Sequence, residues 1–317
     1  MASSAASLNS TNVRNYVLFA WQRLRLAVTS ALAPSVAVEL AARIFATPPR
    51  FAPPQAELEA LAKGKRFAVS SGTGRIAAWR YGDASRPAIV LSHGWGGRGA
   101  QLRAFVPALV DAGYQVVLFD HIGHGASDGT DSSIVHFMRG ITAIVAGIEA
   151  NGAPVVGMIG HSLGAAAVTA WLNETRRDVR VVLVAPPTSV ERYSGYFARK
   201  LGIPERVRRA MQERIESRLG YRWESFELPQ GIARVGAQAL IVHDADDRDV
   251  PVTSGLALAR AWRGAGFVGT KGLGHRRVLR DPSVVADAVD FMKNRTVFAP
   301  PPARGEASAY LAPAPLA

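Results

Sequence analysis

The sequence of 317 residues contains no cysteine. Disulfide bonds, thiolate metal sites and a cysteine nucleophile are therefore all excluded. The sequence also lacks an uninterrupted run of 18 apolar residues, and its closest approach, residues 17–33, holds Gln22, Arg23 and Arg25 in the middle. A membrane-spanning helix and a secretory segment are both disfavoured, because each needs an uncharged apolar stretch.

Lysine is scarce, and the net charge of +12 is carried mainly by arginine. The arginines are spread over the whole chain, and the densest clusters are pairs such as Arg176-Arg177. No nucleic-acid recognition motif accompanies them, so we expect a solvated basic surface and no nucleic-acid partner. The 48% of hydrophobic residues is enough for a large core and argues against disorder.

The N-terminal residues 1–55 are predicted to form a helical extension that ends in a proline-rich linker. Residues 13–45 are expected to be helical, with a break near Pro34, and they mix apolar side chains such as Trp21 with arginines. Three interpretations stay open: an amphipathic helix in weak contact with a membrane surface, a helix that packs on the main domain or covers its pocket, and a targeting segment. We expect a cytoplasmic protein, with or without membrane association.

Short apolar runs alternate with helical segments from about residue 66 onward. Strands are predicted at 75–81, 88–92, 115–120, 155–159, 179–184 and 239–243, and helices at 101–112, 134–149, 163–172 and 283–292. This alternation predicts an α/β fold with a doubly wound, mostly parallel sheet. Residues 66–186 and 237–297 are assigned to this core.

The connection over residues 187–236 is too long for a plain crossover. It includes a helical pattern at 205–219, with apolar residues recurring every four positions. We predict an inserted helical cap over the carboxyl edge of the sheet, and a surface excursion without function is the alternative. Residues 298–317 are rich in proline and alanine without periodicity, so a flexible tail is expected.

The sharpest local signal is Gly160-His161-Ser162-Leu163-Gly164, between an apolar strand and an alanine-rich helix. Acyl transfer needs a serine held out of the sheet on a tight strand-to-helix turn, and small flanking residues suit such a crowded turn. The following helix points the positive end of its dipole at the serine. Ser162 is therefore the candidate nucleophile.

A serine nucleophile needs a base that is itself held in place. Of the two histidines that follow, His243 ends a strand, whereas His275 lies in a glycine-rich loop before the last helix and is the candidate base. An acidic cluster at 244–249 follows the strand. Its spacing to the next proline favours Asp247 as the acid that orients the base, with Asp244 or a neighbour as the alternative.

Residues 93–97, His-Gly-Trp-Gly-Gly, follow directly after a strand. The negative oxygen of a tetrahedral intermediate needs two backbone N–H donors, and glycines let the main chain approach a substrate closely. We assign these donors to Trp95 and Leu163, with Gly94 or Gly96 as alternatives to Trp95.

The other polar residues of these motifs are interpreted as structural. His93 and His161 are expected to orient backbone groups, and Asp120 to shape the turn after its strand. His121 and His124 share no recognisable ligand spacing with a third group, so we predict no metal site and no organic cofactor.

Five segments resemble, in order, the successive landmarks of the α/β-hydrolase superfamily. They are residues 93–96, 120–127, 160–164, 247–251 and 274–275. The resemblance covers about residues 66–295 and implies the chain order Ser, Asp, His. The sequence departs from the pattern at Asp244, where many members carry glycine. Members acting on haloalkanes or epoxides form an alkyl-enzyme at a carboxylate, and Ser162 argues against both activities.

The sequence thus predicts a serine hydrolase that cleaves a small-molecule carboxylic ester or thioester through an acyl-enzyme. Ser162, His275 and Asp247 would form its catalytic triad. C–C hydrolysis of diketones and cofactor-free perhydrolysis use the same machinery. A non-catalytic binding protein on this fold, associated with a membrane through its N-terminal helix, is the alternative from another class.

Overall fold

The chain divides into two compact units. A helical unit consists of residues 1–46 and 190–223, and a sheet unit consists of residues 47–189 and 224–317. The computed structural model describes residues 10–227, 232, 235–294 and 298–302. Most of the tail predicted at 298–317 lies outside these residues.

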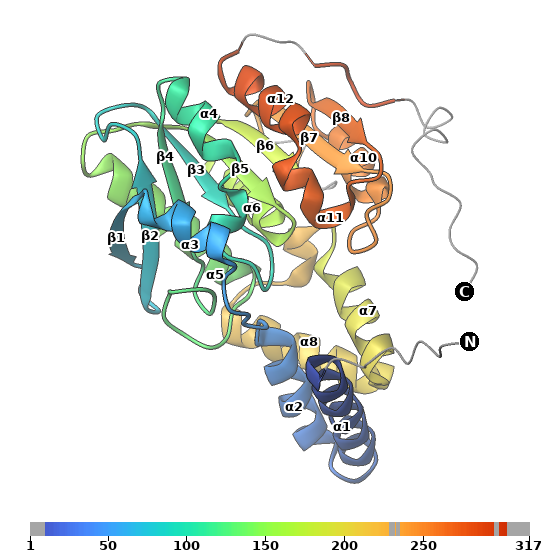
Figure 1. The fold of residues 1–317 in the computed structure, drawn as a ribbon. Helices are drawn as coiled ribbons and strands as arrows, with labels where there is room; N and C mark the ends of the chain where they lie inside the picture. The colour runs from blue at the N-terminus through green and yellow to red at the C-terminus, as the bar shows by residue number, and fades with distance from the viewer. Residues whose placement is uncertain (1–9, 228–231, 233–234, 295–297, 303–317) are drawn as a thin grey trace, which may run out of the picture. The chain divides into compact units, whose positions relative to one another are not determined.

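The sheet unit contains one eight-stranded sheet with the order β1-β2-β4-β3-β5-β6-β7-β8 (Figure 1). The strands are β1 (Lys65–Ser70), β2 (Arg75–Tyr81), β3 (Ala88–Ser92), β4 (Gln115–Phe119), β5 (Val155–His161), β6 (Arg180–Val184), β7 (Ala239–Asp244) and β8 (Gly266–Thr270). The β1-β2 and β2-β4 pairs are antiparallel, and every other pair is parallel. The predicted doubly wound, mostly parallel sheet is confirmed.

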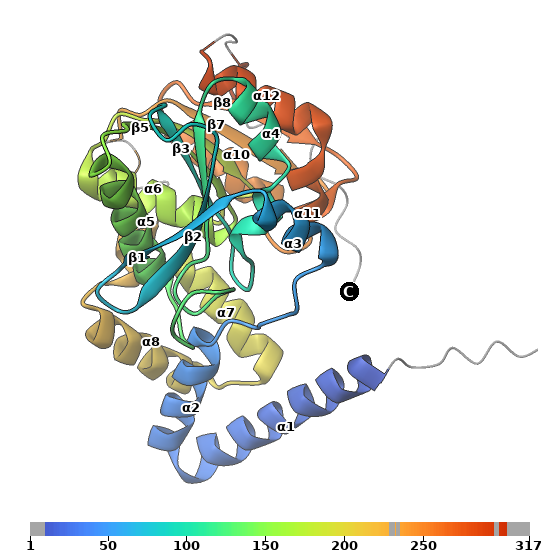
Figure 2. The same ribbon diagram turned by 60° about the vertical axis from the view of Figure 1, so that its left-hand side comes forward.

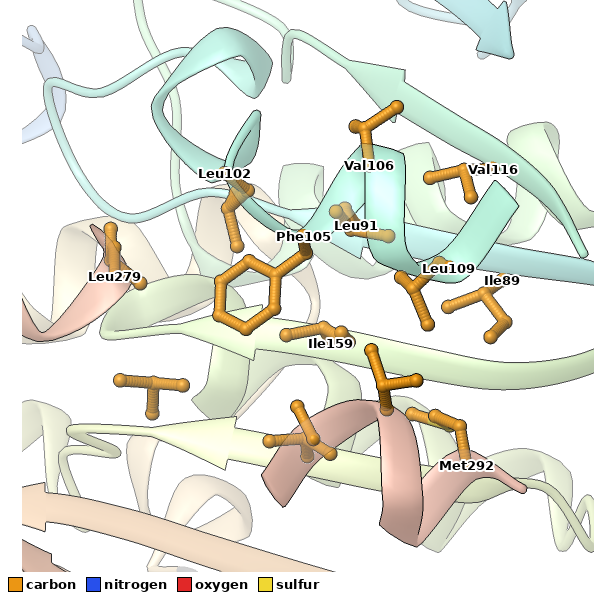
Figure 3. Packing of buried hydrophobic residues seen from close by; sticks show 14 of the residues in the cluster. Ile89, Leu91, Leu102, Phe105, Val106, Leu109, Val116, Ile159, Leu279 and Met292 are labelled. Atoms are coloured by element: carbon orange, nitrogen blue, oxygen red, sulfur yellow. The ribbon is translucent and has the colours of Figure 1, made fainter. Parts of the chain in front are cut away.

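Helices cover both faces of this sheet (Figure 2). Helices α4 (Phe105–Asp111) and α12 (Pro282–Met292) lie on one face, and α5 (Ile134–Glu149) and α6 (Leu163–Thr175) lie on the other. Strands β3, β4 and β7 are buried along their whole length, which explains why their sequences are apolar on both faces. Phe105 and Leu109 of α4 pack over Ile159 of β5 in the core shown in Figure 3.

One sequence expectation is corrected in this unit. The helix expected at 101–112 is instead a short 3-10 turn, Gly99–Leu102, followed by α4. The N–H of Gly99 is donated to the Asp120 carboxylate at 2.8 Å, which fixes this turn on the end of β4. Within the stretch predicted as a proline-rich linker, the Arg50 guanidinium donates to the carbonyls of Gly123 and Gly129 at 3.1 and 2.7 Å.

The remaining helices of the sheet unit include α3 (Gln55–Ala62) and α10 (Val252–Ala261), with the short α11 (Gly274–Arg277) preceding α12. The residue after α10, Trp262, is buried and donates its indole N–H to the carbonyl of Ala237 at 2.8 Å. The start of the C-terminal segment also packs here, since Phe267 of β8 donates its N–H to the carbonyl of Ala299 at 3.0 Å.

The helical unit is built from α1 (Ser10–Leu32), α2 (Pro34–Ala46), α7 (Val190–Leu201) and α8 (Glu205–Leu219). These helices share one apolar core to which Leu26, Leu40, Leu201 and Met211 each contribute. The N-terminal extension and the insert, which the sequence analysis treats as separate parts, thus form a single packed unit. The role of the insert as a cap stays a prediction.

Candidate active site

Ser162 lies on a strained turn between β5 and α6. Its φ of 52° and ψ of −123° place a residue with a Cβ in a region that normally needs glycine. The turn is also crowded: a Cβ on Gly160 would lie 2.6 Å from the Ala165 Cα, and one on Gly164 would overlap the carbonyl oxygen of Ser92. The two glycines are therefore required for the serine to stand at the carboxyl end of the strand.

The loop at 93–97 lies against this serine. A Cβ built on Gly94 would come within 2.9 Å of the Ser162 Cβ. Gly96 donates its N–H to His124 Nε2 at 3.1 Å, so Gly96 is not free to serve as an oxyanion donor. Trp95 and Gly94 are left as the candidates in this loop.

The second predicted donor, Leu163, is the first residue of α6. An N–H in the first turn of a helix has no acceptor within that helix. The N–H of Leu163 is therefore available to an oxygen atom beside Ser162. It has the added benefit of the positive end of the helix dipole.

Asp247 lies in the loop after β7, whereas His275, which the sequence placed in a loop, lies in the short helix α11 that follows β8. The Nδ1 of His275 donates to Asp247 Oδ2 at 2.7 Å, and the other oxygen, Oδ1, accepts the N–H groups of Asp249 and Val250 at 2.8 and 2.9 Å. Because the Nδ1–H of His275 is hydrogen-bonded to this carboxylate, Nε2 is unprotonated in the neutral ring and can accept a proton.

The Asp247 carboxylate is ionised although it is buried. Burial alone would raise its pKa. The hydrogen bonds from His243 and His275 lower the pKa by more than burial raises it, so the pKa lies well below the usual value. His243 Nε2 lies 3.5 Å from Asp247 Oδ2 and donates to the carbonyl of Val250 at 2.9 Å. His243 was not predicted as a site residue, because a histidine at a strand end carries no motif, and the fold places it against the Asp247 carboxylate.

Asp244 has a different position from Asp247. Its carboxylate accepts the hydroxyl of Thr270 at 2.7 Å and the N–H groups of Leu273 and Gly274 at 3.1 and 2.8 Å. These bonds hold the loop that leads to His275. Of the two aspartates left open by the sequence, Asp247 is the one that contacts the imidazole, and Asp244 shapes the loop that carries it.

Ser162 and His275 are connected through His161. The Nε2 of His161 donates to the carbonyl oxygen of His275 at 2.9 Å, and the two rings lie 4.6 Å apart. Among the described residues, the Ser162 hydroxyl makes no hydrogen bond. Catalytic contacts are often long in a substrate-free site and tighten when substrate binds.

Three further histidines, His93, His121 and His124, pack around the ring of Phe137. His93 donates from Nδ1 to the carbonyl of Gly94 and accepts the N–H of His121 at Nε2, which matches its expected role in orienting backbone. Burial lowers the pKa of His93 and His121 well below the usual value and that of His124 to about 4. Within the described ranges, no group of three or more histidine or acidic side chains is placed to hold a metal ion.

A family model described as serine aminopeptidase, S33, matches residues 83–244, slightly more than half of the chain. The chain belongs to this family. The region of this chain that matches the S33 family model includes the 93–97 loop and Ser162, and it ends at Asp244. The placement of Asp247 and His275 therefore comes from the structure.

The fold of this S33-family member is similar to that of several solved hydrolases. An esterase from Pyrococcus furiosus has a TM-score of 0.60 at 18% identity, with 78% of this chain and 97% of that chain covered. Est1E from Butyrivibrio proteoclasticus, solved with ferulic acid, gives 0.57 at 20% identity over 72% and 98%. The 2-hydroxy-6-oxo-6-phenylhexa-2,4-dienoate hydrolase from Rhodococcus gives 0.55 at 21% identity over 73% and 99%. These similarities show the α/β-hydrolase fold.

A curated relative of this S33-family chain is epoxide hydrolase A from Mycobacterium tuberculosis. The two sequences are 31% identical over 105 residues, which is 33% of this chain and 32% of that protein. The chain thus aligns with about a third of the length of the relative. Together with the family match, this similarity supports a hydrolase.

Proposed function

We propose that this protein is a serine hydrolase that cleaves a carboxylic ester or thioester of a small molecule through an acyl-enzyme. The observation that carries the proposal is the 2.7 Å hydrogen bond between His275 Nδ1 and the ionised Asp247, in the segments beside the turn that holds Ser162. An oriented base next to a serine on a strand-to-helix turn is the arrangement that acyl transfer needs.

In the proposed reaction, Ser162 Oγ attacks the ester carbonyl carbon while His275 Nε2 takes the hydroxyl proton. The carbonyl oxygen becomes negative and accepts the N–H groups of Trp95 and Leu163. His275 then gives the proton to the leaving alcohol or thiol, and the bond to the leaving group breaks. A water molecule, deprotonated by the same imidazole, attacks the acyl carbon; the bond from that carbon to Ser162 Oγ breaks, and His275 returns the proton to Oγ as the acid is released. Asp247 holds the imidazole in the required tautomer and stabilises its positive charge.

Epoxide hydrolysis is the second candidate, because a curated relative carries that name. The family resemblance implies a carboxylate nucleophile for epoxide-opening members, and here the turn holds Ser162. A serine alkylated by an epoxide would be an ether, which lacks the carbonyl group that water attacks in the second step of acyl transfer. The residue on the turn therefore favours ester hydrolysis.

A fluorophosphonate probe tests the proposal directly. We expect the probe to label the wild-type protein and the Ser85→Ala control, in which an exposed serine is removed, but not Ser162→Ala. p-Nitrophenyl esters of increasing acyl length, amino-acid p-nitroanilides and styrene oxide then separate ester, amide and epoxide cleavage. A folded wild-type protein without labelling would indicate a binding protein, and diol formation that survives Ser162→Ala would contradict the serine mechanism.

A further inference from the structure

Helix α1 buries only part of its apolar surface. Leu26 is fully buried in the core of the helical unit, where it packs with α2, α7 and α8 side chains. On the other side of α1, large apolar side chains are exposed: Val17 (60%), Trp21 (55%), Leu24 (55%), Val28 (47%) and Leu32 (81%). We call these five residues the α1 stripe.

The α1 stripe is continuous along the helix. Its members follow each other at intervals of three or four residues, so at 3.6 residues per turn they fall within about 80° of one another. Leu26 lies about opposite to the centre of the stripe by the same geometry. Scattered exposed apolar residues are ordinary, whereas a contiguous row that includes a tryptophan marks an interaction surface.

Charge indicates what this surface binds. The helical unit, residues 1–46 and 190–223, carries 13 basic and 5 acidic side chains, a net charge of +8, while the sheet unit carries 24 basic and 20 acidic side chains, a net charge of +4. Two thirds of the excess charge thus lies on about a quarter of the chain. Helix α1 itself contains Arg14, Arg23 and Arg25 and no acidic residue. An anionic surface complements this unit, whereas a second copy would bring two strongly basic units together.

No helix in the described part of the chain is long and apolar enough to cross a membrane. A helix that combines an exposed apolar stripe with basic residues is instead suited to lie in the plane of the lipid headgroups. In that position Trp21 would occupy the interface between headgroups and acyl chains, where tryptophan is favoured. Arg25, which is exposed and flanks the α1 stripe, would contact lipid phosphates.

We propose that α1 docks the protein on an anionic lipid bilayer, with the α1 stripe in the interface and the arginines of the helical unit on the headgroups. This proposal is independent of the hydrolase activity. Both the apolar and the electrostatic contribution are required, because a short apolar stripe alone gives only weak and reversible association.

Flotation of the full-length protein with liposomes tests the docking. We expect binding to vesicles with 30% phosphatidylserine, little binding to pure phosphatidylcholine vesicles, and release from the anionic vesicles in 0.5 M salt, because salt screens the attraction. Trp21→Glu combined with Leu24→Glu should lower the bound fraction at least tenfold. Phe51→Glu combined with Leu58→Glu is the matched control, since it makes the same charge change at exposed apolar residues of the sheet unit and should leave most of the binding.

A second variant tests the charge independently of the stripe. Arg25→Gln should weaken binding to anionic vesicles by about fivefold, while thermal unfolding stays as in the wild type. Equal binding of wild-type and stripe variants, or equal binding to neutral and anionic vesicles, would overturn the proposal. A lipid-free dimer that dissociates in the Trp21→Glu, Leu24→Glu variant would overturn it too, because the stripe would then be a contact between two copies.

Discussion

The imidazole of His161 is bonded to the main chain of His275, with 2.9 Å between Nε2 and the carbonyl oxygen. His161 immediately precedes Ser162, so this bond ties the turn of the candidate nucleophile to the segment of the candidate base. Burial and the neighbouring His275 lower the pKa of His161 to about 3, and the side chain is therefore a neutral donor at physiological pH. The two segments are held together by a residue that takes no part in proton transfer.

Replacing this tether should misplace the base without unfolding the protein. For His161→Leu we expect kcat to fall by about 10- to 100-fold, because shifts of about 1 Å in a catalytic group have effects of that size. His161→Gln keeps a side-chain N–H donor and should lose less. Steady-state hydrolysis of a p-nitrophenyl ester measures both variants, and a His161→Leu enzyme with wild-type kcat would show that the bond has no positioning role.

Asp247→Asn should impair catalysis more than any other change near the base. The amide can present its NH2 group to His275 Nδ1, which would favour the wrong tautomer and remove the negative charge beside the imidazolium. We expect kcat to fall by roughly 10⁴-fold with little change in KM. A loss below tenfold at full stability would mean that a carboxylate other than Asp247 orients the base.

Asp244→Asn should give a different pattern, since its carboxylate binds the backbone of the His275 loop and does not contact the ring. The amide cannot accept all four of the bonds that reach the carboxylate, and one NH2 group would face other donors. We expect about 1–3 kcal/mol of destabilisation with a smaller decrease of kcat than for Asp247→Asn. Urea unfolding combined with kinetics separates the two roles, and the reverse ranking of the two variants in kcat would contradict this assignment.

Gly94→Ala should block the site while leaving the core intact. The new Cβ would approach the Ser162 Cβ to 2.9 Å, so either the loop at 93–97 or the serine must move. We expect loss of fluorophosphonate labelling and at least a 100-fold decrease of kcat/KM. Gly72→Ala is a control at a glycine with open space around it, where only the positive φ of 79° costs stability. Normal labelling of Gly94→Ala would place the loop further from the nucleophile.

The buried histidines predict a loss of stability in weak acid. His93, His121, His124 and His161 all have pKa values lowered by burial, so they stay neutral when folded but are protonated near pH 6.5 when unfolded. The unfolded state therefore binds more protons, and the free energy of unfolding falls as pH drops below about 6.5, by up to about 1.4 kcal/mol per pH unit for each histidine. The contribution of His124 ends near pH 4, its pKa in the folded state, whereas the other three histidines, whose pKa values are lowered further, contribute to lower pH.

Urea unfolding between pH 7.5 and 4.5 measures this dependence. His121→Phe should reduce the slope of the unfolding free energy against pH by the contribution of one histidine, up to about 1.4 kcal/mol per pH unit, because Phe cannot be protonated in either state. A flat profile over this range would show that the histidines are accessible to protons in the folded protein.

The sequence alone predicted the central strands well and the edges poorly. Strands β3 to β7 are apolar on both faces, and α5 has the predicted bounds because Ser133 caps its first turn. Strand β1 is partly exposed and contains charged residues, and β8 contains two glycines within five residues, so neither has the pattern of a buried strand. The joint core of α1, α2, α7 and α8 depends on contacts between distant segments that no local pattern records.

The main residues of the candidate site could be predicted from the sequence, but the hydrogen bonds between them could not. Motif and chain order were sufficient to single out Ser162 and His275. The spacing to the next proline favoured Asp247 over Asp244, but a run of closely spaced acids left Asp244 open, because the contact depends on which carboxylate faces the segment after β8. The hydrogen bond of Arg50 joins segments that are far apart in the sequence. His243 lies at the end of a strand that carries no motif. Neither contact could be predicted from a local pattern.

The positive φ of Ser162 has a consequence for the evolution of this protein. A glycine at this position would adopt the same dihedral angles without steric conflict, so Ser162→Gly should melt at a higher temperature than the wild type while losing all turnover. Selection for robustness alone would therefore discard the hydroxyl. The serine at this position thus costs stability, and the proposed acyl transfer gives its hydroxyl a use that would offset this cost.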